Sequence, residues 1–149
     1  MKRIAVLVDI SEQGWESCMT SALERLREAG HEPFVQPVHL GSGRSWRQLK
    51  SHHDGCIRCS GFLTAGVRTE TAREFMAWHS DALLVLPLRE TKALEQLVAG
   101  ADSDMKISRK GILNAQTDVQ LGVGQGEPAL DQSGFLEEAL KLLQTMFWR

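Results

Sequence analysis

Residues 81–100 read Asp81-Ala82-Leu83-Leu84-Val85-Leu86-Pro87-Leu88-Arg89-Glu90-Thr91-Lys92-Ala93-Leu94-Glu95-Gln96-Leu97-Val98-Ala99-Gly100, and this stretch decides the fold. It opens with an apolar run that does not alternate, which is typical of a strand buried on both faces of a parallel sheet. After Pro87, apolar residues recur at helical spacing, and Thr91 is the predicted N-cap of that helix. Ligands of open α/β sheets bind beside loops at the carboxyl ends of strands. We therefore expect residues 87–92 to lie at a binding site.

The first 40 residues carry the same alternation of strand and helix. Residues 4–8 form a second uninterrupted apolar run and predict another central strand, followed by a polar loop at 9–14. Apolar residues at three- and four-residue spacings then predict a helix over 15–29, which ends before Gly30. Residues 33–38 predict a strand nearer an edge, because its two prolines cannot donate to a neighbouring strand. Together these segments form a βαβ unit of a parallel sheet.

Residues 41–66 interrupt the pattern. Gly41-Ser42-Gly43-Arg44-Ser45 predicts a polar loop, and residues 46–49 predict a short helix. A segment of this length without a clean period is usually functional or mobile in a compact domain. Thr71-Ala72-Arg73-Glu74 then has the pattern of a capping box, and it predicts a helix with His79 on its apolar side.

The C-terminal third completes the predicted domain. It contains, in order, a polar loop, two weaker strands, a turn and an amphipathic helix, at residues 101–110, 111–115, 119–123, 124–128 and 135–147. Residues 1–149 therefore predict a single doubly wound α/β domain of the Rossmann or flavodoxin type, with a parallel sheet of four or five strands.

Composition narrows the classes of partner. A chain of 149 residues with a net charge of −2 has no charge excess that would favour nucleic acid or an anionic membrane surface. Its apolar runs are shorter than a membrane span, so a cytoplasmic protein is expected. Three cysteines in a chain of this length argue against a disulfide framework.

Two polar loops are candidates for binding phosphate. Ser11 offers a hydroxyl beside the first amides of the helix that follows, although a serine there is also explained by helix capping alone. The loop after the second predicted strand adds the hydroxyls of Ser42 and Ser45 and the charge of Arg44. Three spaced glycines after the first strand are absent, which argues against NAD.

The pair Cys56 and Cys59 follows His52 and His53, and three interpretations of this segment stay open. These four side chains are zinc ligands of the usual types, and two cysteines at this spacing can cycle between dithiol and disulfide. Against zinc, structural sites usually pair two such segments; against redox cycling, the motif does not open a helix after a strand. The third interpretation is a pair of ordinary loop cysteines.

The 81–104 segment resembles the signature "aDlvvvaPatanTiaklanGiaDdl" of the homo-oligomeric flavin-containing cysteine decarboxylase family, and residues 2–11 and 26–32 resemble its first strand, loop and helix end. The resemblance implies FMN, enclosed with the help of oligomeric contacts that are commonly trimeric. It implies that the phosphate-binding serine is Ser11 and that the hydroxyl of the fourth loop is Thr91. Ser42 or Ser45 would correspond to the hydroxyl after the second strand.

The chain also departs from this family. Ile10 stands where the family has a glycine before the serine, and Arg73 falls where the family has its catalytic histidine. A guanidinium stays protonated and is no base at neutral pH, so decarboxylation of peptidyl or pantetheinyl cysteine is not expected. The "PaMN" motif of the phosphopantothenoylcysteine decarboxylases has no counterpart, and residues 114–116 occupy its place.

The sequence therefore favours a cytoplasmic, homo-oligomeric FMN-binding flavoprotein that acts in electron transfer or an allied redox step, with the Cys56 and Cys59 loop as a candidate redox partner. The first alternative is a flavin-free ligand-sensing or interaction module on the same fold. The second is an FMN-dependent decarboxylase whose acid or base is supplied by His52, His53 or His79.

Overall fold

The computed structural model describes residues 1–60, 64–122 and 131–147. The strands are β1 (Arg3–Asp9), β2 (Glu32–His39), β3 (Ile57–Arg58), β4 (Ala82–Val85), β5 (Lys106–Arg109) and β6 (Val119–Leu121). The helices are α1 (Trp15–Glu28), α2 (Gly43–Gln48), α3 (Glu70–Ala77), α4 (Lys92–Gly100) and α5 (Gln132–Phe147), with 3-10 turns η1 (Lys50–His52) and η2 (Ala65–Arg68). Among the described helices, none is long and apolar enough to cross a membrane.

The strands form one parallel sheet in the order β3-β2-β1-β4-β5-β6. This confirms the predicted doubly wound α/β fold, with six strands where four or five were expected. β1 and β4 are the central pair, in the register Ile4 to Ala82, and all four residues of β4 are buried. The strand order reverses between β1 and β4, which is where doubly wound proteins bind their ligands.

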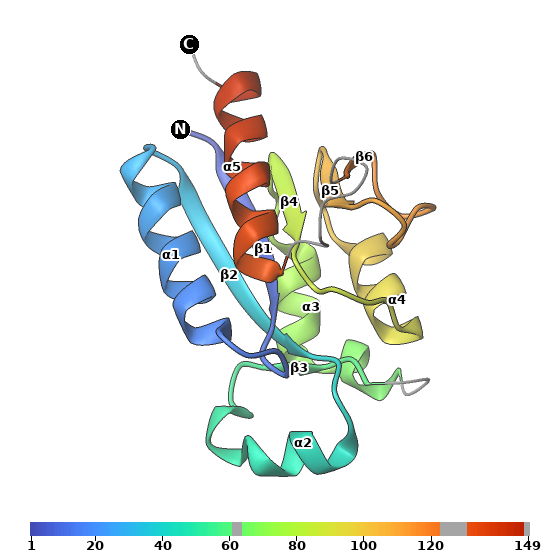
Figure 1. Cartoon of the computed structure of the whole chain (residues 1–149). Helices are drawn as coiled ribbons and strands as arrows, with labels where there is room; N and C mark the ends of the chain where they lie inside the picture. Colours follow the sequence, from blue (N-terminus) through green and yellow to red (C-terminus); the bar gives the residue numbers. More distant parts are fainter. Residues whose placement is uncertain (61–63, 123–130, 148–149) are drawn as a thin grey trace.

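Helices cover both faces of the sheet, so the apolar core has two halves (Figure 1). On one face, Ile4, Val6 and Val8 of β1 pack with buried residues of α1 and α5. On the other, Ala5 and Leu7 pack with α3 and α4. This alternation explains why the β1 sequence is apolar at every position. The short α2 stands apart from both layers, below the carboxyl ends of β1 and β2 in Figure 1.

The two prolines of β2 both face away from β1. Glu32 donates its N–H to the Lys2 carbonyl beside β1, whereas the His39 carbonyl accepts from Cys59 on the β3 side. Because backbone groups alternate in direction along a parallel strand, the nitrogens of Pro33 and Pro37 share the side of His39. β3 pairs only with the last two residues of β2, so neither proline removes a hydrogen bond from the sheet.

The structure corrects the predicted strands beyond residue 100. β5 lies within the segment that was expected to be a loop, and the strand expected at 111–115 is a turn, with φ of +90° at Gly111 and +55° at Leu113. Only Ile107 of β5 is a buried apolar residue, which is why the sequence signal is weak. The strand predicted at 119–123 is confirmed as β6, and the turn predicted at 124–128 lies outside the described residues.

Two local predictions around the helices were also wrong. Thr69, not Thr71, caps α3, because its hydroxyl accepts the N–H of Ala72. The helix ends at Ala77, so His79 lies beyond it with a side chain that is 45% exposed, and it is not on an apolar helix face. The predicted loop at 41–45 contains the first turn of α2, capped by Ser42, and the predicted short helix is confirmed as part of α2.

Candidate functional site at the carboxyl edge of the sheet

Loops that follow β1, β2 and β4 meet at the carboxyl edge of the sheet, the edge nearest α2. Asp9 ends β1, His39 ends β2, and the loop between β4 and α4 carries Arg89. The Nη2 of Arg89 lies 3.4 Å from the hydroxyl of Ser11, so the predicted loops after β1 and β4 come together in space. The two segments that were expected to bind a ligand, residues 87–92 and the Ser11 loop, therefore lie next to each other.

Asp9 is the fully buried centre of this edge. Its Oδ1 accepts the N–H of Ser11 at 2.9 Å, the hydroxyl of Ser11 at 2.6 Å and the N–H of Leu40 at 3.2 Å. The side-chain amide of Gln132 joins α5 to the same point, accepting from Asp9 N at 2.7 Å and donating to Asp9 O at 3.0 Å. Within the described residues, Oδ2 of Asp9 has no hydrogen-bond partner. Such buried acceptors without a partner are rare in folded proteins and commonly mark an ordered water or a ligand.

His39, also fully buried, connects this carboxylate to α2. Its Nε2 lies 3.1 Å from the Ser45 hydroxyl, and its Nδ1 has no partner in the described part of the chain. Burial lowers the pKa of His39; the Asp9 carboxylate opposes this effect, and the positive charges of Arg58 and Arg89 add to it. A neutral imidazole beside a carboxylate and two arginines can donate or accept a hydrogen bond from a ligand.

Gly41 allows the loop after β1, the end of β2 and the start of α2 to approach one another closely. A Cβ atom at this position would lie 2.8 Å from the Cβ of Ser11, 3.0 Å from the His39 ring and 3.2 Å from the Ser45 hydroxyl. Any side chain at residue 41 would therefore force these groups apart. Ser11 and Ser45, which come from separate predicted loops, are brought together here.

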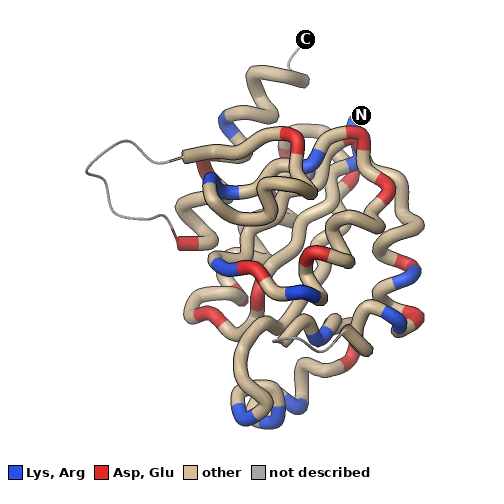
Figure 2. Tube along the Cα trace, turned by 90° about the vertical axis from the view of Figure 1, so that its right-hand side faces the viewer, with Lys and Arg blue, Asp and Glu red and all other residues tan. Residues whose placement is uncertain are grey.

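Positive charge gathers on the α2 side of these hydroxyls, whereas Glu12 and Glu16 lie on the α1 side. A Cβ atom on Gly43 would lie 3.3 Å from Nη2 of Arg58 and 3.7 Å from Nη1 of Arg47, so two guanidinium groups gather at the start of α2. The first turn of α2 has no acidic residue, and Figure 2 shows basic positions grouped on this lowest part of the chain. Like charges held together favour an anion, and guanidinium groups suit phosphate.

The remaining two predicted ligand residues have hydrogen bonds within the protein. The Ser42 hydroxyl accepts from Ser45 N at 3.2 Å. The Thr91 hydroxyl donates to the Cys59 carbonyl at 2.6 Å and accepts from Leu94 N at 3.1 Å, which confirms it as the N-cap of α4. Thr91 thereby ties the β4 loop to β3, and one lone pair of its oxygen is left for a ligand.

A hollow of about 330 Å³ opens beside the serines. It is lined by the loop and first turn of α1, from Ile10 to Glu16, and by Ser45, Gln48 and Leu49 of the α2 segment. Gly14 precedes α1 with a positive φ of 79° and provides no side-chain cap, so the first amides of α1 are open to a ligand. The hollow therefore combines helix amides with hydroxyls, as phosphate sites do.

The surroundings of Cys56 and Cys59 indicate a structural role for the two cysteines and not a reactive pair. Cys56 and Cys59 are free thiols that flank β3, and an extended segment of this length separates Cα atoms by roughly 10 Å, too far for a disulfide. Burial raises the pKa of each thiol to about 12. His52 contacts the edge of Trp15, and His53 stacks on Trp46, so the histidines pack on aromatic rings. The described residues contain no metal-ligand cluster in this loop.

His79 does not belong to this site. It precedes β4, whereas Arg89 and Thr91 follow it, so the length of the strand separates them. The expectation that His79 supplies an acid or base beside the bound ligand therefore conflicts with the geometry.

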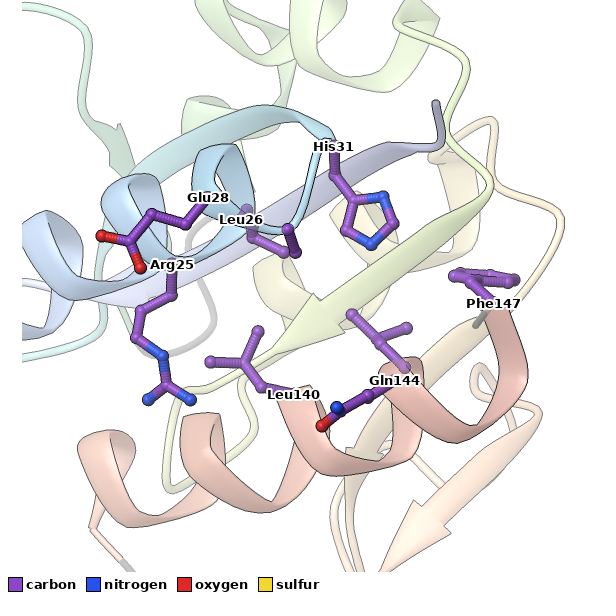
Figure 3. A pocket seen from close by; sticks show the side chains of 9 residues that line it. Arg25, Leu26, Glu28, His31, Leu140, Gln144 and Phe147 are labelled. Carbon is purple, nitrogen blue, oxygen red and sulfur yellow. The ribbon is translucent and has the colours of Figure 1, made fainter. Parts of the chain in front are cut away.

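A second hollow, of about 340 Å³, lies at the opposite edge between α1 and α5 (Figure 3). Leu26, His31, Leu140 and Phe147 line its apolar centre, and Arg25 with Glu28 stands at its rim. Burial lowers the pKa of His31, which favours its neutral form. Among the described residues that line it, none is a serine or threonine, and Arg25 is its one arginine.

Sequence reasoning missed Asp9, His39 and Arg89 as site residues. Asp9 and His39 each stand directly at the end of an apolar strand, and Arg89 lies within the loop that was singled out. A charged or titratable residue directly after a buried strand was the available signal.

The fold and these loops define a class: a doubly wound α/β protein with a polar, arginine-bearing site at its switch point. A scan against protein-family models and a search of curated proteins both found no match for this chain. Membership of the flavin-containing decarboxylase family accordingly stays a prediction from the sequence.

Proposed function

We propose that the protein is a small flavoprotein that binds FMN at the carboxyl edge of the sheet and acts in electron transfer. The observation that carries the proposal is the contact between Arg89 and Ser11 across the switch point, which places a cation and a hydroxyl beside open helix amides. In this arrangement the FMN phosphate contacts Ser11, Ser45 and Arg89. A phosphate dianion held by a guanidinium and hydroxyls gains charge-assisted hydrogen bonds.

The buried polar atoms support a ligand that carries hydroxyls as well as phosphate. Oδ2 of Asp9 accepts from a ribityl hydroxyl in this proposal, and Nδ1 of His39 exchanges a hydrogen bond with another. Both atoms lack partners among residues 1–60, 64–122 and 131–147 and are buried at the same strand ends. Bound FMN supplies the redox chemistry, and these residues bind and orient it.

The proposal includes a homo-oligomer, because the hollow at Ser11 is lined by one loop and the α2 segment alone. A second copy of the chain would cover the flavin on the open side. Light scattering of the flavin-loaded protein gives the oligomer mass, and a loaded monomer would remove this part of the proposal.

Flavin titration tests the proposal. We expect the purified protein to quench FMN fluorescence on titration, and Arg89→Gln to weaken FMN binding by about 10- to 100-fold, since a hydrogen bond to a charged group contributes about 1.5–3 kcal/mol. Riboflavin lacks the phosphate, so its weaker binding should change little in Arg89→Gln.

Arg27→Gln is the matched control, because Arg27 lies at the far end of α1 and should leave both titrations unchanged. An absence of quenching by FMN would favour the flavin-free module instead. An equal loss of FMN and riboflavin binding in Arg89→Gln would show that Arg89 acts on the fold and not on the phosphate.

A further inference from the structure

The amino edge of the sheet carries a cluster of a different chemistry. The ligand atoms of His79, Asp81 and Asp104 all lie within 4.8 Å of one another. His79 precedes β4, and Asp104 precedes β5, so the cluster joins the starts of two neighbouring strands. It lies at the opposite end of the strands from Ser11 and Arg89.

The backbone holds these side chains in place. Ser80 N donates to Asp102 O at 2.9 Å, Asp104 N donates to Ser80 O at 3.0 Å, and Ser80 pairs with Ser103 in a parallel bridge. Asp81 is fixed in the same way, because its N–H donates to the Arg3 carbonyl and its Oδ2 accepts from Arg3 N at 2.7 Å. The cluster is therefore preorganised by the sheet and not by the side chains themselves.

The histidine has the environment of a metal ligand. Its Nε2 lies 3.5 Å from Oδ2 of Asp104, and its Nδ1 lies 3.3 Å from Oδ1 of Asp102. Histidines that bind metals usually donate their second ring N–H to a carboxylate, which fixes the tautomer and the ring orientation. Ligand atoms around a tetrahedral Zn²⁺ ion lie roughly 3.3–3.6 Å apart, which the pair of His79 and Asp104 already matches.

The charges of the side chains in this cluster are predominantly negative and favour a cation. Three carboxylates surround one imidazole, and the guanidinium of the nearby Arg3 is directed elsewhere, 3.6 Å from Glu32 and 4.0 Å from the Trp78 ring centre. His79, Asp102 and Asp104 have side chains that are 45%, 61% and 66% exposed, so an ion reaches them from solvent. An imidazole combined with carboxylates suits zinc and its neighbours, whereas Mg²⁺ and Ca²⁺ prefer oxygen ligands alone.

We propose that His79, Asp81 and Asp104 bind a divalent transition-metal ion of the zinc type, with Asp102 as the carboxylate that orients the His79 imidazole. The ion would link the starts of β4 and β5, so binding stabilises the fold and raises the thermal midpoint. This site is independent of the proposed flavin site, because no residue is shared between them.

Calorimetric titration of the metal-free full chain with Zn²⁺ tests the proposal. We expect one ion per chain, an increase in the thermal midpoint, and no displacement of Zn²⁺ by excess Mg²⁺. His79→Gln and Asp104→Asn should abolish the binding, and Asp102→Asn should weaken it about 10- to 100-fold, as changes to outer carboxylates do. All three side chains are exposed, and circular dichroism verifies that the variants remain folded.

Cys56→Ser is the matched control, because it alters the other conceivable zinc ligands and should leave the titration unchanged. Titration with Co²⁺ adds a spectroscopic criterion: a site of nitrogen and oxygen ligands lacks the strong charge-transfer absorption of cobalt thiolates. Retention of Zn²⁺ by His79→Gln, loss of it in Cys56→Ser, a thiolate absorption band, displacement by Mg²⁺, or no binding at all would each overturn the proposal.

Discussion

The two edges of the sheet carry opposite chemistry at opposite ends of its strands. At the carboxyl edge, arginines from α2, β3 and the β4 loop lie beside Gly43 and Ser11, next to the buried Asp9. At the amino edge, the exposed carboxylates of Asp102 and Asp104 and the half-buried carboxylate of Asp81 surround one histidine. The first arrangement suits an anion and the second a cation, although the net charge of the chain is only −2. The local placement of charges therefore distinguishes the two edges better than composition does.

The edges also differ in how their polar groups are protected. Asp9 and His39 are fully buried and each keeps one atom without a partner in the described residues. At the other edge, His79, Asp102 and Asp104 remain solvated. Changes at the carboxyl edge should therefore act on stability and reactivity, whereas changes at the amino edge should act mainly on ion binding.

The largest difference is expected in thiol reactivity beside the carboxyl edge. The pKa of Cys56 and of Cys59 is raised to about 12 by burial, so at pH 8 the thiolate fraction is roughly 10³-fold below that of an ordinary cysteine. Alkylation of these thiols in the native protein should be slower than in urea by about that factor. Mass spectrometry of timed samples measures the two rates. Equal rates, or a reversible disulfide between the two cysteines on mild oxidation, would restore the redox interpretation of this loop.

The second prediction compares one aspartate from each edge. Asp9→Ala removes the acceptor of three hydrogen bonds and leaves the buried N–H of Leu40 unpaired, so it should cost about 2–4 kcal/mol of the free energy of unfolding. Asp81→Ala removes one bond to a partly buried N–H and should cost about 1 kcal/mol or less. Urea denaturation gives both values, and a similar loss in the two variants would contradict the distinction between a buried and an exposed edge.

The third prediction concerns pH and has the smallest effect. Burial lowers the pKa of His39 in the folded state, so the unfolded chain binds a proton first as the pH falls through the ordinary histidine pKa. Stability is therefore retained at neutral pH and lost below about pH 6.5, by at most about 1.4 kcal/mol per pH unit for this one proton.

His39→Gln should reduce that slope without removing it, because burial also lowers the pKa of His31. Urea midpoints collected between pH 7 and pH 5 measure the slope for both proteins. An unchanged slope in His39→Gln would place the proton uptake at another group.

The sequence predicted those elements in which local pattern and tertiary environment agree. β1 and β4 are apolar at consecutive positions because helices cover both faces of the sheet, and α1, α4 and α5 show the helical spacing of helices that pack on it. Ser11, Ser45 and the β4 loop were predicted as parts of a site because each follows a strand. Parallel strands bring their carboxyl ends to one edge, so this much follows from sequence order.

The rest depends on contacts that a single chain segment does not reveal. β5 is recognisable only through its pairing with β4 and β6, since Lys106 and Arg109 are partly exposed and Ile107 alone is apolar and buried. The Thr91 hydroxyl was expected to contact a ligand, but a carbonyl 32 residues earlier in the chain accepts its proton. In the amino-edge cluster, Asp104 lies more than 20 positions after His79 and Asp81. No sequence motif indicates that their loops pair.

The direction of the two prolines in β2 affects the tendency of copies of the chain to aggregate through their edge strands. β3 covers only the last two residues of β2, so most of that edge would present unpaired N–H groups to any passing strand. Pro33 and Pro37 remove two of these donors on that very side, while Glu32 begins the strand with a charge. During synthesis β1 and β2 emerge before β3. In that interval the prolines leave fewer N–H groups with which a strand of a second nascent chain could pair, which reduces aggregation.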